Sequence, residues 1–224
     1  MEAAIYRTAT AINEAMARVY GYMSLAVIVS MITSYLIGTS PAAVALLFGT
    51  GLKWVVMFAP LVFIFLVPVM FNAGIGKVGA QLVLYLFAAV MGVSFATIFV
   101  VYTMGSIASA FMGAAVLFGV MSIYGYFTKQ SLDNLGKYLF IALIAIVIAS
   151  VINIFIGSTV FQTVISAIAI IVFLGLTAYD TQKIREEVSV DNDGMAEIYG
   201  ALTLYLDFIN LFISLLQIFG DKKE

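Results

Sequence analysis

The stretch that decides the fold runs from Val160 to Phe219 and reads VFQTVISAIAIIVFLGLTAYDTQKIREEVSVDNDGMAEIYGALTLYLDFINLFISLLQIF. It contains two long apolar segments separated by a polar connector, with Asp180 in the first and Asp207 in the second. The step Asp193-Gly194 lies midway between the two aspartates and is a strong turn signal. In an antiparallel helical hairpin with its tip there, each aspartate lies about 13 residues, or roughly 20 Å, from the tip. The sequence therefore predicts that the two carboxyl groups lie level and meet.

The second apolar segment carries a stripe of polar side chains. They recur at alternating spacings of four and three residues, which places them on one face of a helix: Thr203, Asp207, Asn210, Ser214 and Gln217. A carboxylate among the apolar neighbours of Asp207 must face protein, water or an ion, because a charge in hydrocarbon is costly. For Asp180 a second interpretation stays open, in which a carboxylate near a helix end reaches the lipid headgroups. We expect the stripe to face the interior of the protein.

The composition defines the class of protein. Of the 224 residues, 64% are hydrophobic and 10% are charged, and the mean hydropathy is +1.15. Soluble domains carry about a quarter charged residues, so the sequence predicts an all-α integral membrane protein with one domain over residues 1–224. The absence of cysteine excludes disulfides and thiolate chemistry, and a net charge of -2 offers no basic surface for nucleic acid. Histidine is absent too, so proton sensing near neutral pH must rely on carboxylates.

Seven apolar segments are each long enough to cross about 30 Å of hydrocarbon. Their predicted bounds are 20–37, 54–71, 80–102, 106–127, 138–156, 160–179 continuing toward 190, and 198–219. A short polar helix is expected before the first span, within residues 1–18. Gly105, Ser109 and Gly113 are spaced four apart and predict a face for close helix packing.

The lysines and arginines between the spans predict the orientation, because cytoplasmic loops carry an excess of them. Seven lie in segments that share one side of the membrane: Arg7, Arg18, Lys77, Lys129, Lys137, Lys183 and Arg185. Three lie on the other side: Lys53, Lys222 and Lys223. We therefore expect the N-terminus in the cytoplasm and the C-terminus outside. A re-entrant last segment would instead return the C-terminus to the cytoplasm.

We expect no enzymatic activity. Intramembrane aspartyl proteases also use paired aspartates, which share a proton and activate water. The second aspartate of those enzymes follows Gly-x-Gly, whereas Asp207 follows Leu-Tyr-Leu, which makes this the weaker alternative. The GxGxxG pattern at Gly74–Gly79 matches a dinucleotide site but follows no predicted strand, so we interpret it as a membrane loop.

Two motifs resemble the Bax inhibitor-1 family, also called the transmembrane Bax inhibitor motif family. The run LTAYDTQKIRE at Leu176–Glu186 is similar to the family's signature, and LYLDFINLFISLLQIFG at Leu204–Gly220 is similar to its C-terminal segment. The resemblance covers essentially the whole chain, and the lack of a long extension suggests a prokaryotic member in the inner (plasma) membrane. It implies a seven-transmembrane-helix bundle with the C-terminal helix central. It also implies a calcium leak that pH regulates through paired aspartates, here Asp180 and Asp207.

These observations give an expected site. Asp180 and Asp207 are the predicted pH-sensing and gating pair, which would also bind Ca²⁺ transiently, and no predicted span contains a lysine or arginine that could neutralise them. No cofactor is expected. Calcium takes six to eight oxygen ligands, so other groups must line the pore or coordinate the ion, and the candidates are Thr177, Thr181, Thr203, Asn210, Ser214 and Gln217.

The function expected from the sequence is a pH-sensitive calcium leak, with the lipid bilayer, calcium ions and protons as partners. Two other functions stay open. The aspartate pair could serve a proton-coupled cation transporter, or the chain could be a non-transporting regulator that binds another membrane protein through its lipid-facing helices. A leak would run downhill without a proton gradient. A regulator would keep its function after both aspartates were changed to asparagine.

Overall fold

The computed structural model describes residues 7–59, 62, 66 and 74–223. Its helices are α1 (Ala9–Gly38), α2 (Pro41–Phe48), α4 (Gly76–Val101), α5 (Met104–Phe127), α6 (Asp133–Ile156), α7 (Thr159–Val190) and α8 (Met195–Phe219). A further helical segment covers Leu52–Ala59 and meets α2 at 89°. Six of the described helices are long and apolar enough to span a membrane, or up to seven if the bent pair is one span. The chain is therefore an integral membrane bundle of helices.

Short polar residues and glycine set the ends of several helices. The side chains of Thr103 and Ser158 accept hydrogen bonds from backbone N–H groups in the first turns of α5 and α7, where the helix itself offers no acceptor. Gly157 ends α6 in the left-handed conformation, with φ at 69°. Only two residues separate α4 from α5, and only two separate α6 from α7. Each of these helix pairs therefore reverses direction in a short loop.

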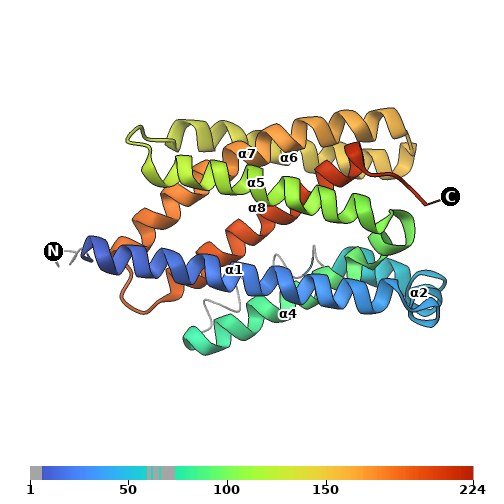
Figure 1. The fold of residues 1–224 in the computed structure, drawn as a ribbon, viewed down its shortest axis with the longest axis horizontal. Helices are drawn as coiled ribbons and strands as arrows, with labels where there is room; N and C mark the ends of the chain where they lie inside the picture. Colours follow the sequence, from blue (N-terminus) through green and yellow to red (C-terminus); the bar gives the residue numbers. More distant parts are fainter. Residues whose placement is uncertain (1–6, 60–61, 63–65, 67–73, 224) are drawn as a thin grey trace.

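Helix α8 lies between two groups of helices (Figure 1). It contacts α1 and α4 on one side and α5 and α7 on the other, and it is the most buried of the six candidate spans. Helix α6 packs on α7 at the periphery, where only Gly136 and Asn153 among its residues are buried. Large apolar side chains cover the outside, among them Phe155 and Ile171. An apolar exterior of this extent is what a lipid-facing surface requires.

The two chain ends lie at opposite ends of the bundle (Figure 1). The N-terminal end, which we call the basic end, also holds the starts of α4, α6 and α8 and the ends of α5 and α7. Seven of the ten lysines and arginines lie at or near it: Arg7, Arg18, Lys77, Lys129, Lys137, Lys183 and Arg185. The other three lie toward the C-terminal end. The charge asymmetry predicted from the loops is thus a property of the folded bundle.

The structure differs from the predicted helices in two places. Helix α1 is continuous from Ala9, so the predicted separate helix before residue 20 is wrong; the helix continues because Ala15, Met16 and Val19 are buried in the core. Helix α2 lies between the predicted spans 20–37 and 54–71, where no helix was predicted. Of the predicted span 54–71, the structure describes 54–59, 62 and 66, and the rest of that prediction lies outside the described residues.

The closest helix contacts involve other glycines than the predicted ones. A Cβ added at Gly105 would meet no neighbour within 4 Å, and one at Gly113 would meet a single atom at 3.9 Å, so the predicted close-packing face is wrong. A Cβ added at Gly125 of α5 would instead lie 2.1 Å from the carbonyl oxygen of Ala178 on α7. Only a glycine permits the backbones to approach so closely. Helix α5 therefore packs directly on α7 at Ala178, two residues before Asp180.

Candidate functional site

Helices α7 and α8 form the predicted antiparallel hairpin. Helix α7 ends at Val190 and α8 begins at Met195, and Gly194 between them adopts a φ of 77°. This left-handed conformation favours glycine. A side chain at Gly194 would also collide with Lys77, whose Nζ lies 2.6 Å from the ideal Cβ position. The turn predicted at Asp193-Gly194 is therefore confirmed.

The hairpin brings Asp180 of α7 and Asp207 of α8 together. Their carboxyl groups lie within hydrogen-bonding reach of each other. Asp207 is only 4% exposed, whereas Asp180 is partly buried. Two carboxylates so close repel strongly unless a proton or a cation lies between them. The arrangement of the two groups is therefore one that a bound proton or cation would stabilise.

A cavity of about 560 Å³ reaches from the tip of the hairpin to Asp180, and we call it the vestibule. Its lining comes from α7, α8 and the turn between them: Asp180, Lys183, Ile184, Glu187, Val190, Asp191, Met195, Ala196, Tyr199 and Thr203. Three of these side chains are acidic and one is basic. Water and cations at the basic end of the bundle can therefore reach Asp180, whereas Asp207 is not part of the lining.

The three threonines predicted as ligands lie near the pair, in different environments. Thr203 lines the vestibule, and its hydroxyl donates to a backbone carbonyl of α8 at 3.1 Å. Thr177 is fully buried and donates to a backbone carbonyl of α7 at 2.7 Å. Thr181 is fully buried as well, and among the described residues its Oγ1 and the Oδ2 of Asp207 have no hydrogen-bond partner. These two oxygens are free to contact water or an ion.

The remaining residues of the stripe extend away from the pair. Asn210 and Ser214 donate to backbone carbonyls one turn earlier in α8, at 2.8 and 2.7 Å. Gln217 lies ten residues beyond Asp207, about 15 Å along the helix. Thr203 therefore shares the vestibule with Asp180, whereas Gln217 lies at the far end of the α7–α8 interface. Gln217 is exposed, so the prediction that the whole stripe faces the interior is wrong at this residue.

Gln217 belongs to a second polar cluster, which the sequence did not reveal. Its Oε1 accepts hydrogen bonds from Ser166 Oγ at 2.6 Å and from Gln162 Nε2 at 2.9 Å, both on α7. Asn153 of α6 donates to Gln162 at 2.9 Å. Gln162 and Ser166 are spaced four apart on an apolar helix, and this spacing was a signal for the cluster.

Comparison with known proteins shows the family. The family model described as "Inhibitor of apoptosis-promoting Bax1" matches residues 12–224, which is nearly the whole chain. The chain belongs to this Bax inhibitor-1 family. It is 40% identical over 215 residues to inner membrane protein YbhL of Escherichia coli, covering 93% of this chain and 92% of that protein. It is 37% identical over 214 residues to an uncharacterized membrane protein of Streptococcus pyogenes, covering 93% of each.

A further relative is an uncharacterized protein of Rickettsia prowazekii, which is 36% identical over 216 residues, covering 93% of this chain and 90% of that protein. These matches confirm the family resemblance drawn from the motif at Leu176–Glu186. They also cover both helices of the α7–α8 hairpin. The two aspartates thus lie inside the part of the chain that defines the Bax inhibitor-1 family match.

This Bax inhibitor-1 family member has a second buried carboxylate, which sequence reasoning missed. Glu197, in the first turn of α8, is 1% exposed. It accepts hydrogen bonds from Arg18 Nε and Nη2 at 2.9 and 2.7 Å and from Lys77 Nζ at 2.8 Å. Arg7 Nη1 lies 3.6 Å from it. Glu197 therefore ties α8 to α1, to α4 and to the segment before α1.

Arg18 and Lys77, which contact Glu197, lie on helices but outside the predicted apolar bounds. The helices extend beyond the predicted apolar bounds, so α1 includes Arg18, α4 includes Lys77 and α7 includes Lys183. Lys183 lines the vestibule close to Asp180. The cations could not be assigned to Glu197 from the sequence, because they come from segments more than a hundred residues away.

The tip of the hairpin holds two further carboxyl groups outside the helices. Burial and a hydrogen bond with Asp193 raise the pKa of Asp191 above its ordinary value. The backbone N–H of Met195 donates to Asp193 at 3.0 Å, and this hydrogen bond lowers the pKa of Asp193. Arg7 Nη2 lies 3.9 Å from Asp191. At neutral pH the tip therefore keeps a negative charge on Asp193 beside the vestibule.

Proposed function

We propose that this Bax inhibitor-1 family member is a passive calcium leak whose flux depends on protons bound to the Asp180–Asp207 pair. The observation that carries the proposal is the interaction of the two carboxyl groups, one of which, Asp180, lines an acidic vestibule. Calcium prefers carboxylate and other oxygen ligands. Acidic walls in a cleft also raise the local concentration of cations. Protons and calcium would then compete for the same oxygens, which makes the flux depend on pH.

Protons act by changing the charge of the pair. With one shared proton, Asp180 and Asp207 hydrogen-bond to each other and hold α7 against α8. Without a proton the two charges repel and attract a cation, and with two protons the anionic site is gone. Because the groups interact so closely, the pair titrates as a unit and not as two separate residues. The free oxygens of Thr181 and Asp207 are available to complete the coordination of a passing ion.

Apolar side chains close the interface between α7 and α8 beyond the pair. Phe173 and Leu176 of α7 and Phe208 and Leu211 of α8 are buried in one apolar core. An ion can pass this region only if α7 and α8 move apart, so the arrangement corresponds to a closed state. In the proposed mechanism, repulsion within the doubly ionised pair drives this separation.

The number of spans and the orientation of the chain in the membrane complete this proposed function. We propose seven spans with α8 central, a cytoplasmic N-terminus, an external C-terminus and a prokaryotic inner membrane. Three observations support it: α8 has helices on both sides, the basic end holds seven of the ten lysines and arginines, and a relative with 40% identity is an inner membrane protein. The vestibule would then open to the cytoplasm.

Calcium flux through purified protein in liposomes tests the proposal. With a calcium gradient and a protonophore that removes any proton gradient, calcium should move downhill. Glu186→Gln is the matched control, because Glu186 is an exposed carboxylate on α7 outside the vestibule. Flux that requires a proton gradient would support the coupled transporter instead. No flux through wild-type protein, with cellular function kept in Asp180→Asn and Asp207→Asn, would support the non-transporting regulator.

A further inference from the structure

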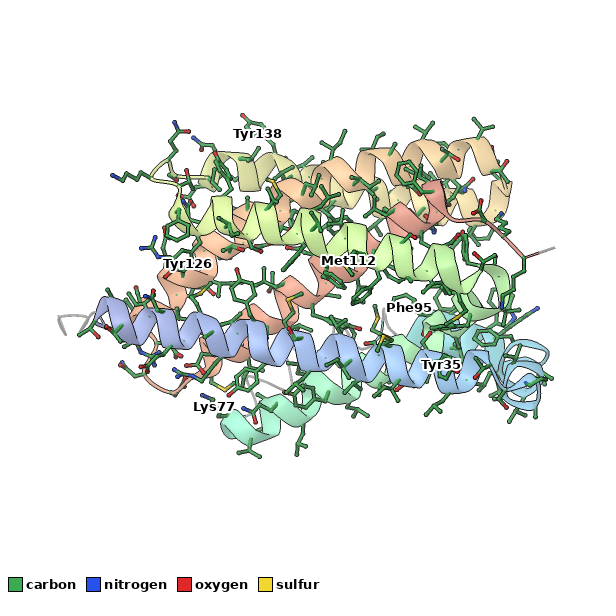
Figure 2. The ribbon with its side chains drawn as sticks, in the orientation of Figure 1. Tyr35, Lys77, Phe95, Met112, Tyr126 and Tyr138 are labelled. Atoms are coloured by element: carbon green, nitrogen blue, oxygen red, sulfur yellow. The ribbon has the colours of Figure 1, made fainter. Side chains whose placement is uncertain are left out.

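A second cavity, of about 460 Å³, lies between α1 and α5 toward the C-terminal end of the bundle, and we call it the groove. Helices α1 and α5 form its walls, and α4 and α8 form its floor. Figure 2 shows Tyr35 of α1, Phe95 of α4 and Met112 of α5, which line it from three sides. The volume is within the range of ligand sites, roughly 300–1,000 Å³. The groove is thus large enough to hold part of a bound molecule.

The groove opens sideways toward the membrane. Tyr35 and Met112 at its rim are exposed apolar side chains on opposite walls. The lining residues of α1 run from Val27 to Leu36, which is about 14 Å of helix, close to half of the roughly 30 Å hydrocarbon layer. Lipid acyl chains surround the protein within the hydrocarbon layer, and the groove extends over about one leaflet of it. An acyl chain of that leaflet therefore fits it in both chemistry and length.

One polar atom in the wall calls for a hydrogen-bonding ligand. Ser34 lines the groove, is 4% exposed, and its Oγ has no partner among the described residues. Ser30, one turn earlier, is fully bonded, to two backbone carbonyls and to the hydroxyl of Tyr205 at 2.6 Å. A buried hydroxyl without a partner is costly. Ser34 lies only about 6 Å before the end of α1 at Gly38, a depth that the ester carbonyls of a phospholipid can reach.

Positive charge lies at the same end of the groove. Lys223 Nζ donates to the backbone carbonyl of Phe99, a residue of the groove floor, at 2.6 Å. Lys222 precedes it and pairs with Tyr102 through the backbone. Asp221, whose backbone N–H donates to Ser106 at 2.8 Å, is the acidic neighbour in this tail. In the sequence the two lysines lie between the acidic residues Asp221 and Glu224, so the tail has no net positive side-chain charge. The ammonium group of Lys223 is nevertheless held at the groove floor, where it can contact the phosphate of a lipid headgroup.

We infer that the groove binds one phospholipid of the adjoining leaflet. Its acyl chain lies between α1 and α5, its ester carbonyl accepts a hydrogen bond from Ser34, and its phosphate lies near Lys222 and Lys223. The floor of the groove includes Ile209 and Phe212 of α8. The bound lipid therefore contacts the helix that also carries Asp207. This inference does not depend on the proposed calcium flux.

Native mass spectrometry of delipidated protein in detergent, titrated with dioleoyl phosphatidylglycerol, tests the site. Wild-type protein should bind one lipid well before any others. Ala108→Trp, which fills the groove from α5, should lower the affinity for this first lipid at least tenfold. Val116→Trp is the matched control, because Val116 is an exposed residue of α5 outside the groove, and it should bind as wild type does. Equal affinity in the two tryptophan variants would overturn the inference.

The diether analogue of the same lipid tests the contact with Ser34, because it lacks ester carbonyls. Wild-type protein should prefer the ester lipid by roughly three- to tenfold, which corresponds to one hydrogen bond. Ser34→Ala should bind the two lipids equally. Its far-ultraviolet circular dichroism should match wild type, since only one hydroxyl is removed. Equal binding of ester and ether lipids by wild-type protein would overturn the proposed contact.

Discussion

The contacts of Glu197 predict a large loss of stability in Glu197→Gln. The substitution keeps the size of the side chain but removes the charge that Arg18 and Lys77 contact in three hydrogen bonds. Hydrogen bonds to charged groups are worth about 1.5–3 kcal/mol each. Arg18 and Lys77 are 42% and 34% exposed, so water can hydrate them after the change and the loss per contact is smaller. We expect the free energy of unfolding to fall by about 2–4 kcal/mol, near the lower end for breaking a buried ion pair.

Denaturant-induced unfolding in detergent micelles measures this loss. Glu186→Gln is the control, because it removes an exposed carboxylate and should change the free energy of unfolding by less than about 0.5 kcal/mol. The double variant Lys77→Gln/Glu197→Gln should lose less than the sum of the two single variants, since both remove the same contact. If Glu197→Gln were as stable as the control, the cluster would not hold the helices together as described.

Three further predictions concern the vestibule, the helix packing and the orientation. Thr203→Cys should react with a water-soluble thiol reagent that reaches the basic end, whereas Leu204→Cys should not, because Leu204 is fully buried. Equal labelling of the two positions would show that Thr203 does not line a water-accessible vestibule. Gly125→Val should push α5 off Ala178 and lower the free energy of unfolding by about 3 kcal/mol or more in micelles, whereas Gly105→Val should cost less than about 1 kcal/mol. Reporter enzymes fused to the C-terminus should be active only outside the cytoplasm, and cytoplasmic activity would reverse the proposed orientation.

The hairpin and its aspartate pair could be predicted from the sequence because the information is local. Asp180 and Asp207 are equally far from a glycine turn, and helical rise alone then places them level. The five polar residues on α8 share one helical period, and the interior face predicted from it holds for Asp207 and Ser214, which are buried, but fails at Gln217, which is exposed. Periodicity does not show how far along the helix axis each residue lies from the aspartate pair. Gln217 is about 15 Å away and contacts Gln162 and Ser166 instead of the pair.

The Glu197 cluster and α2 could not be predicted in the same way. Glu197 receives cations from three segments far apart in the chain, and no local pattern links them. Helix α2 did leave a local signal, since Ser40 caps it and Pro41 occupies its first turn, a combination that favours a helix start. Its eight residues are too few to cross the hydrocarbon layer, so the stretch is not among the predicted spans. The close approach of Gly125 to Ala178 depends on tertiary packing alone.

The pH dependence of calcium flux tests the central claim most directly. Wild-type protein in liposomes, measured at equal pH on both sides, should change its flux across the acid-to-neutral range as the Asp180–Asp207 pair gains or loses a proton. Asp180→Asn and Asp207→Asn should each flatten the profile, and the double variant should abolish it, while Glu186→Gln keeps the wild-type profile. A double variant whose profile matches wild type would show that the proton sensor lies elsewhere.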